Sequence, residues 1–281
     1  MSETDQTQQQ SSSNSNSNVS IQQCINHKFV KSIVTRINFL AKQILKYLTT
    51  KELLIESILC VAIALGLKYM DIYVWDIHQR PYPYQITEAG DVILDFEVDQ
   101  PYRDMTVSTT KNYKMNLVGV VLVFSCFAVL SNAPHGDFHC GGCVLAIAFG
   151  LSSLFCDTTK RYTGRLRPHF FQSCHFDVDL LECTVDDSEK RLSFPSGHSH
   201  MAFTCMSVLA LYLYGKAYGR MRRKGHADWT VRILTLLGFL PLLRAFYVSA
   251  SIYKDNWHHS ADVVAGAIIG FACAFVSYHL W

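Results

Sequence analysis

The sequence predicts an all-α fold: a six-span transmembrane helical bundle with its functional residues at the extracytoplasmic ends of the helices. Two observations predict this class. Of 281 residues, 49% are apolar and only 17% are charged, which is few charges for a soluble domain. The apolar residues also gather in nearly uncharged stretches of about 18 residues or more, long enough to cross a hydrocarbon core of about 30 Å.

Six spans account for these apolar stretches, and an even number returns both termini to the same side of the membrane. The first span is the least apolar because it contains Glu56 and Lys68, and the third is short. Together the spans form one domain over residues 53–281. We expect them at residues 53–75, 115–133, 140–157, 198–214, 233–251 and 263–281.

The basic residues predict the orientation, because short loops rich in lysine and arginine stay in the cytosol. The loop at 215–232 has six basic residues and one acid, whereas the loop at 76–114 has seven acids and four bases. Both termini are therefore expected in the cytosol. The loops at 158–197 and 252–262 are expected outside the cell or in the lumen of an organelle, so the plasma membrane and an endomembrane both stay open.

The N-terminal region divides into two segments before the first span. Residues 1–27 are a Gln/Ser/Asn-rich tail with too few apolar residues to build a core, and we expect it to be disordered in the cytosol. Residues 28–51 place apolar residues at helical spacing among lysines, which is typical of a basic amphipathic helix on the inner leaflet. No secretory signal precedes the first span, so that span is expected to direct insertion.

Most of the ten cysteines do not indicate a disulfide scaffold, and the sequence favours buried apolar roles within the expected spans for Cys60, Cys126, Cys156, Cys205 and Cys273. Cys174 and Cys183 differ, since both fall in the loop assigned to the oxidising side. The sequence is consistent with a disulfide between them and also with a pair of free thiols. The HCGGC run at 139–143 lacks a second pair of ligands, so we expect no metal site there.

A basic cluster, KRYTGRLRP, runs from Lys160 to Pro168 in the same outer loop. It can be read as a membrane anchor of snorkelling side chains, or as a ligand for an anion. Anchoring clusters are expected on the cytoplasmic side, whereas this one faces outward. The second interpretation is therefore favoured, with lysine and arginine as the groups that hold a phosphate.

A second motif, SFPSGHS, spans Ser193 to Ser199 directly before the fourth span. Proline and glycine form a tight turn, and the Ser196 hydroxyl with the free amides at the helix start predicts an anion-binding nest. His198 stands at the mouth of this nest. In the alternative interpretation, Ser196 only caps the helix and His198 is an interfacial residue.

The third motif, SIYKDNWHHSAD, runs from Ser251 to Asp262. His258 and Asp262 are four residues apart and share a helix face, so the carboxylate can accept the imidazole proton. That bond fixes the tautomer and leaves the other ring nitrogen free to act as a base or nucleophile. Alone, this pair could equally be a passive cap.

Together these motifs resemble the type 2 phosphatidate phosphatase superfamily, and within it the integral-membrane lipid phosphate phosphatases. The signatures of that family are KxxxxxxRP, PSGH and SRxxxxxHxxxD. Residues 160–168 and 195–198 match the first two in full, and the resemblance covers roughly residues 53–281. The third signature is matched except that Ile252 stands where arginine is expected.

The resemblance implies hydrolysis of a lipid phosphate monoester: phosphatidate, lysophosphatidate, sphingosine 1-phosphate or ceramide 1-phosphate. It implies that Lys160 and Arg167 bind the phosphate oxygens, with Ser196 and the Gly197 amide completing the cradle. No metal or other cofactor is implied. The expected partners are the lipid phosphate and the bilayer, without nucleic acid, and a homo-oligomer stays open.

The catalytic roles carried over from the family fall on three residues. His258 would attack phosphorus and form a phosphohistidine, and Asp262 would orient it. His198 would protonate the departing lipid alkoxide and then activate the water that releases phosphate. Family members acting on sugar phosphates or polyprenyl diphosphates share these signatures, so the choice of headgroup depends on weaker evidence.

Ile252 leaves two functions open, an active phosphatase and a catalytically weak or silent relative that binds lipid phosphates. Loss of one transition-state donor typically costs on the order of 100- to 1000-fold in rate. Arg244 lies eight residues away, or about 12 Å along a helix, which is too far to substitute. We expect Lys254, on an irregular loop, to be the compensating cation if there is one.

Overall fold

The computed structural model describes scattered positions between 30 and 45 and all of residues 50–281 apart from Trp75, Asn132, Ala133, Asp186 and Asp187. The tail at 1–27 lies outside the described residues. So does most of the segment at 28–51, where the described positions are helical. Its placement on the inner leaflet stays a prediction.

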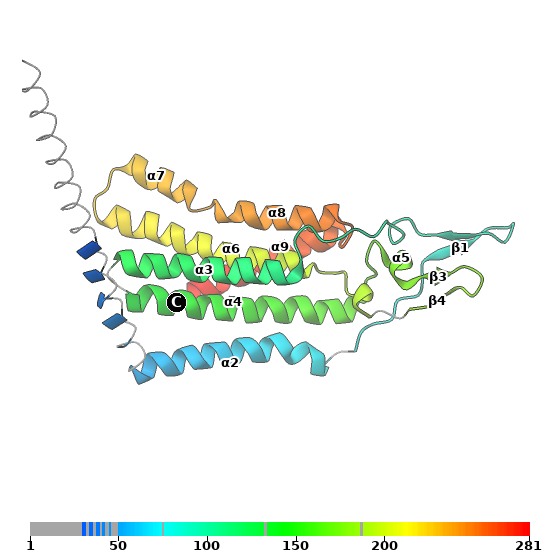
Figure 1. Cartoon of the computed structure of the whole chain (residues 1–281), viewed down its shortest axis with the longest axis horizontal. Coiled ribbons are helices and arrows are strands. Elements are labelled where there is room, and N and C mark those ends of the chain that lie inside the picture. Colours follow the sequence, from blue (N-terminus) through cyan, green and yellow to red (C-terminus); the bar gives the residue numbers. More distant parts are fainter. Residues whose placement is uncertain are drawn as a thin grey trace, which may run out of the picture.

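Long helices dominate the fold, as the sequence predicts, and they run side by side (Figure 1). They are α2 (Lys51–Val74), α3 (Thr109–Ser131), α4 (Pro134–Thr163), α6 (Gly197–Tyr214), α8 (Pro241–Lys254) and α9 (Ser260–Leu280). A π-helical turn, η2 (Gly215–Met221), and α7 (Asp228–Leu237) connect α6 to α8.

The connections at one end of the bundle form a cap, which comprises residues 76–107 and 164–196. The cap contains two short antiparallel hairpins and lies at the opposite end from α7 (Figure 1). The loops predicted to share one side of the membrane therefore do gather together, away from the basic loop at 215–232. The elements of the cap are β1 (Tyr84–Ile86), β2 (Val92–Leu94), α5 (Phe170–Cys174), β3 (Phe176–Asp177), β4 (Glu182–Cys183) and the 3₁₀ turn η1 (Ser188–Arg191).

A disulfide joins Cys174 at the end of α5 to Cys183 on β4. This resolves the alternative that the sequence left open. The half-cystine at 174 is buried in a small apolar cluster with Leu166, Phe170 and Phe171. The cap thus has a core and a covalent link of its own, which fix the segment that carries the basic motif.

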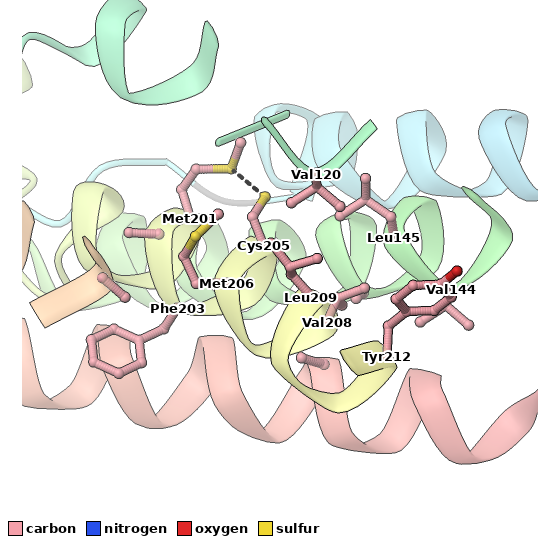
Figure 2. Close-up of a cluster of buried hydrophobic side chains, with 14 of the residues drawn as sticks. Val120, Val144, Leu145, Met201, Phe203, Cys205, Met206, Val208, Leu209 and Tyr212 are labelled. Carbon is pink, nitrogen blue, oxygen red and sulfur yellow. Dashed lines mark hydrogen bonds between the residues drawn. The ribbon is translucent and has the colours of Figure 1, made fainter. Parts of the chain in front are cut away.

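The main core surrounds α6, which contacts α3, α4, α8 and α9. Met201, Cys205 and Val208 of α6 are almost completely buried, and they meet Val120 of α3 and Leu145 of α4 (Figure 2). Because neighbouring helices cover nearly all of α6, this helix exposes little surface to its surroundings. It forms the interior rod of the bundle, and its first residues carry the PSGH motif.

Four segments in the part of the chain that the structure describes are long and apolar enough to cross a membrane: Lys51–Met70, Phe138–Thr163, Asp228–Lys254 and Ser260–Leu280. They coincide with four of the six predicted spans. The other two predicted spans coincide with α3 and α6, in which the described residues alone do not meet this criterion, although both helices pack in the bundle. The chain is an integral membrane protein, and six crossings remain an expectation.

Close contact between α6 and α9 depends on small residues in α9. A Cβ at Gly266 would lie 2.6 Å from the backbone oxygen of Ser196, and one at Gly270 would lie 2.5 Å from that of His200. Both distances are shorter than a non-bonded contact allows. The glycines therefore set how closely α9 approaches the PSGH segment.

We expect Gly266→Ala to destabilise the folded protein by about 1 to 3 kcal/mol, because the new methyl group would push α9 away from a backbone atom that cannot yield. Thermal unfolding of purified protein in detergent measures this loss. Gly142→Ala is the matched control, since Gly142 lies in α4 and no atom stands within 4 Å of the added carbon. An equal loss in both variants would show that close packing at Gly266 is not the cause.

Candidate active site

The three sequence motifs meet at a cavity of about 270 Å³ between the cap and the end of the bundle. Side chains of α3, α4 and α6 line it, together with the loop between α8 and α9. Of the seven residues that the family resemblance assigns to the site, five line this cavity: Lys160, Arg167, Gly197, His198 and His258. Ser196 and Asp262 are buried directly behind it.

His258 is held by a backbone oxygen. Its Nδ1 lies 2.7 Å from the carbonyl oxygen of Ser193 and 3.6 Å from Oδ2 of Asp262. A carbonyl oxygen only accepts hydrogen bonds, so Nδ1 carries the proton and Nε2 keeps its lone pair. The sequence predicted Asp262 as the acceptor, whereas the shorter contact goes to Ser193.

The electrostatic surroundings keep the His258 ring neutral. Burial lowers the pKa of His258 well below its usual range, and the positive charges of Lys160 and Arg167 lower it further, against the raising effect of the Asp262 carboxylate. A neutral ring with a free Nε2 is the form that can attack an electrophile.

Asp262 is completely buried and is held by three neighbours. Oδ1 accepts a hydrogen bond from Nη1 of Arg165 at 2.8 Å, and Oδ2 accepts from the Ser193 hydroxyl at 2.6 Å and from the backbone N–H of His259 at 3.0 Å. His259 is the N-cap residue of α9, and it forms a capping box with this carboxylate. Arg165 and Ser193 were not among the site residues predicted from the sequence, although both bind Asp262 directly.

Lys160 and Arg167 place two positive charges at the cavity wall. Lys160 is nearly buried, and its Nζ donates to the backbone oxygen of Leu192 at 3.1 Å. The Nε of Arg167 donates to the backbone oxygen of Glu189 at 3.1 Å, and its guanidinium carbon lies 5.0 Å from the centre of the Trp257 ring. Both groups are cations at the cavity wall, and cationic N–H donors of this kind favour an anion in the cavity.

The PSGH segment supplies the start of α6 to the cavity. Ser196 is the N-cap, since its Oγ accepts from the backbone N–H of Ser199 at 3.4 Å. Its hydroxyl therefore has the capping function that the sequence analysis gave as the alternative. Gly197 lines the cavity beside Lys160, and the open helix start favours an anion there.

His198 also lines the cavity, and its Nε2 is buried without a hydrogen-bond partner among the described residues. A buried polar atom without a partner is uncommon in a folded protein. Its place in the cavity wall makes this nitrogen available to a bound ligand. His198 thus has the position that transfer of a proton to or from that ligand requires.

The third-motif position that departs from the family is apolar and closed. Ile252 lies in the last turn of α8 with 1% of its surface exposed. Lys254 is the last residue of that helix, where the sequence analysis expected an irregular loop. Its side chain is exposed and does not line the cavity. The structure does not bring Lys254 to the site.

Cys156, Asp157 and His200 place three potential metal-ligand atoms within 4.8 Å of one another beside the cavity. Asp157, however, is paired with Nζ of Lys68 at 2.9 Å, and Lys160 stands one helical turn away. Two ammonium groups oppose a divalent cation there, so this cluster does not fit a metal site.

The fold and the cavity define a class: an integral membrane protein whose buried cavity combines two cations with two histidines, suited to bind an anionic group and react with it. Residues 141–281, half of the chain, match the PAP2 superfamily, and they include all the residues described above that line the cavity from α4, α6 and the last loop. The chain belongs to the PAP2 superfamily, which confirms the family resemblance of the motifs.

The matches to curated relatives cover a longer part of the chain than the match to this domain does. Lipid phosphate phosphatase 1 of Arabidopsis thaliana is 32% identical, and the match covers 70% of this chain and 60% of that protein. The probable diacylglycerol pyrophosphate phosphatase 1 of Schizosaccharomyces pombe is 29% identical over 78% of each chain. Phospholipid phosphatase 1 of Mus musculus is 29% identical over 78% of this chain and 81% of its own. No solved structure gives a significant match.

Proposed function

We propose that this protein is a membrane phosphatase that hydrolyses lipid phosphate monoesters, with phosphatidate, lysophosphatidate, sphingosine 1-phosphate and ceramide 1-phosphate as candidate substrates. One observation carries the proposal: two cations and two histidines from three distant segments line a single cavity. The names of the relatives from Arabidopsis and mouse support a phosphorylated lipid as substrate.

In the first step, Nε2 of His258 attacks phosphorus. An N–P bond forms and the bond from phosphorus to the lipid oxygen breaks, while His198 gives a proton to the departing alkoxide. The Ser193 carbonyl and the Asp262 carboxylate lie next to Nδ1, so they stabilise the positive charge that the ring acquires.

In the second step, water attacks the phosphohistidine. His198 takes the proton of the water, the N–P bond breaks, and inorganic phosphate leaves with His258 neutral again. Lys160, Arg167 and the amide of Gly197 would hold the phosphate oxygens in both steps, since they line the same cavity. Because these groups supply the positive charge, the scheme needs no metal.

The membrane topology that fits this function has six crossings, by α2, α3, α4, α6, α7 with α8, and α9. Both termini and the basic loop at 215–232 would be cytosolic, and the cap would face outside or the lumen. The disulfide between Cys174 and Cys183 supports this orientation, because disulfides persist on the oxidising side. The site would then act on lipids of the outer or lumenal leaflet.

A second candidate function is a silent relative that binds lipid phosphates without hydrolysing them. The observation that favours it is Ile252, since a buried isoleucine gives no hydrogen bond where the family signature has arginine. Against it stands the complete arrangement of His258, Asp262 and His198 around one cavity.

Phosphate release from purified protein separates the two functions. The panel contains the four candidate lipids in detergent micelles with EDTA present, and membranes prepared without the protein serve as the blank. We expect release above the blank with at least one lipid. Binding of the same lipids without any release would support the silent relative and contradict the phosphatase.

We expect Arg165→Met to lower kcat by about 10- to 100-fold with little change in KM, because Asp262 would lose a charge-assisted hydrogen bond worth about 1.5 to 3 kcal/mol. Steady-state kinetics with the best lipid of the panel measures this. Arg165→Lys keeps the charge and should recover part of the rate. A raised KM with unchanged kcat would instead place Arg165 on the substrate.

A further inference from the structure

The first turn of α3 presents to the cavity a buried amide that none of the three sequence motifs contains. Thr109, Asn112 and Tyr113 line the cavity, and their spacing of three and four residues puts them on one face of the helix. Asn112 is 1% exposed, so its side chain lies inside the protein and not at the rim. A buried amide needs hydrogen-bond partners, and these partners decide which of its polar atoms is left for a ligand.

A chain of three hydrogen bonds joins Asn112 to an arginine in α8. Nε of Arg244 donates to Oδ1 of Asn116 at 3.0 Å, and Nδ2 of Asn116 donates to Oδ1 of Asn112 at 2.6 Å. Nδ2 of Asn112 then donates to the backbone oxygen of His198 at 3.2 Å. The chain therefore runs from inside the bundle to the residue proposed to transfer the proton.

The two ends of this chain fix the orientation of both amides. A guanidinium only donates hydrogen bonds and a backbone carbonyl only accepts them, so each asparagine must accept through its oxygen and donate through its nitrogen. A flip of either amide would bring two donors together at one contact and two acceptors together at the other. Nδ2 of Asn112 carries two hydrogens, and the His198 carbonyl takes one of them. The second has no acceptor among the described residues, in a side chain that lines the cavity.

Arg244 gives the chain a positive charge at its inner end. It lies in an apolar segment that is long enough to cross a membrane, about 15 Å along the helix from Lys254 at the outer end. Its Nη2 is buried without a hydrogen-bond partner among the described residues. Charged groups inside membrane spans are costly, and they mark places where function needs them. Because each hydrogen bond polarises the next, this charge strengthens the N–H of Asn112 as a donor.

We propose that Asn112 donates its second hydrogen to an oxygen of the phosphate monoester, and that Arg244 orients and polarises this donor through Asn116. The inference rests on the proposed phosphatase function and adds to it a substrate contact outside the three motifs. Asn112 lines the cavity and touches the ligand, whereas Arg244 and Asn116 are positioning residues behind it. A fixed donor of this kind stabilises the negative charge on the phosphoryl oxygens in the transition state.

The first test measures phosphate release by Asn112→Leu, which keeps the approximate size of the side chain and removes its N–H donors. We expect kcat to fall on the order of 100-fold. Arg244→Met should lower kcat by about 10-fold, because the donor remains but is no longer fixed and polarised. Arg232→Met is the matched control, since Arg232 is exposed on α7 in the same apolar segment, and it should behave as wild type. Retention of at least half of the wild-type kcat by Asn112→Leu overturns the proposal, and so does an equal loss in Arg232→Met.

A double-mutant cycle tests whether Arg244 acts through the asparagine. If it does, adding Arg244→Met to Asn112→Leu should lower kcat by less than about twofold more, because the donor that the arginine orients is already gone. Arg244→Lys keeps the charge and should recover part of the rate. Multiplication of the two single losses in the double variant would show that the arginine supports the fold alone, and the chain would be overturned.

Orthovanadate provides a readout that does not require turnover, because it adopts the trigonal bipyramidal geometry of the transferring group. Its affinity is measured from the rise in unfolding temperature during a titration. We expect at least tenfold weaker binding by Asn112→Leu, and binding equal to wild type overturns the contact. Asn112→Asp is the second variant, since it has the shape of asparagine without the N–H donors, and it should show the same loss even if Asn112→Leu does not fold.

The vanadate titration also separates this contact from the phosphatase function on which it rests. Wild type that binds vanadate but releases no phosphate from any lipid contradicts the phosphatase, while the comparison with Asn112→Asp still decides the contact. Wild type that releases phosphate and loses nothing in Asn112→Asp contradicts the contact and leaves the phosphatase standing. Wild type that neither binds vanadate nor releases phosphate contradicts both.

Discussion

His258→Ala is expected to reduce phosphate release from a lipid phosphate by about 10⁴-fold or more, because the variant lacks the atom that attacks phosphorus. His258 is buried, its Nδ1 proton is held by Ser193, and its Nε2 is free at neutral pH. A second readout is the covalent intermediate. Brief reaction of wild type with labelled substrate and quenching in alkali should trap a base-stable, acid-labile phosphoenzyme, and His258→Ala should trap none.

His259→Ala is the matched control for this prediction, since the chain offers two adjacent histidines. The ring of His259 contacts Asp262 at 3.2 Å and the backbone oxygen of Glu97 at 3.1 Å. Loss of this ring should weaken the support of Asp262 and lower the rate of phosphate release by about 100-fold at most. A phosphoenzyme that survives in His258→Ala but disappears in His259→Ala would show that the spacing of the family signature assigns the wrong histidine.

The sequence predicted which segments form the site, because residues within one short motif stay close together in the folded chain. Lys160, Arg167, His198 and His258 were identified from three short stretches, and they line one cavity. Helix periodicity correctly placed Asp262 next to His258, but it could not show that the backbone oxygen of Ser193, 65 positions away, is closer to the ring. Such a contact depends on how the cap folds over the bundle.

Local helix geometry explains the residues whose positions the sequence did not predict. Lys254 follows Ile252 by two residues and was expected to reach the site from a loop, but α8 continues to Lys254 and turns its side chain outward. Arg165 could have been found, since it lies within the basic cluster two residues before Arg167.

The membrane spans differ in how clearly hydropathy identifies them. Hydropathy identifies α2, α4, α9 and the α7 to α8 segment because apolar residues dominate them. α6 differs since other helices surround it. Its polar residues, such as Ser199 and Thr204, are satisfied by contacts within the bundle, with Ser249 and with the backbone of His200. An interior helix needs no apolar outer face, so its sequence resembles a lipid-facing span less.

His198→Ala is expected to lower hydrolysis of a lipid phosphate by about 10²- to 10⁴-fold, because an alkoxide leaves poorly without a proton. p-Nitrophenyl phosphate is the informative second substrate, since p-nitrophenolate leaves without protonation. With this ester, His198→Ala should form the phosphohistidine at nearly the wild-type rate and then accumulate it, because attack by water still needs a base. Quenched-flow labelling measures both steps.

The leaving-group dependence also separates proton transfer by His198 from a role in holding the cavity open. His200 is the control, because it lies in the same helix, borders the same cavity and has no assigned proton transfer. His200→Ala should change the rates with both substrates by the same factor. If His198→Ala also slows both substrates equally, its Nε2 does not protonate the leaving group, and the acid must be another group. The unpartnered Nε2 would then be a ligand for the phosphate itself.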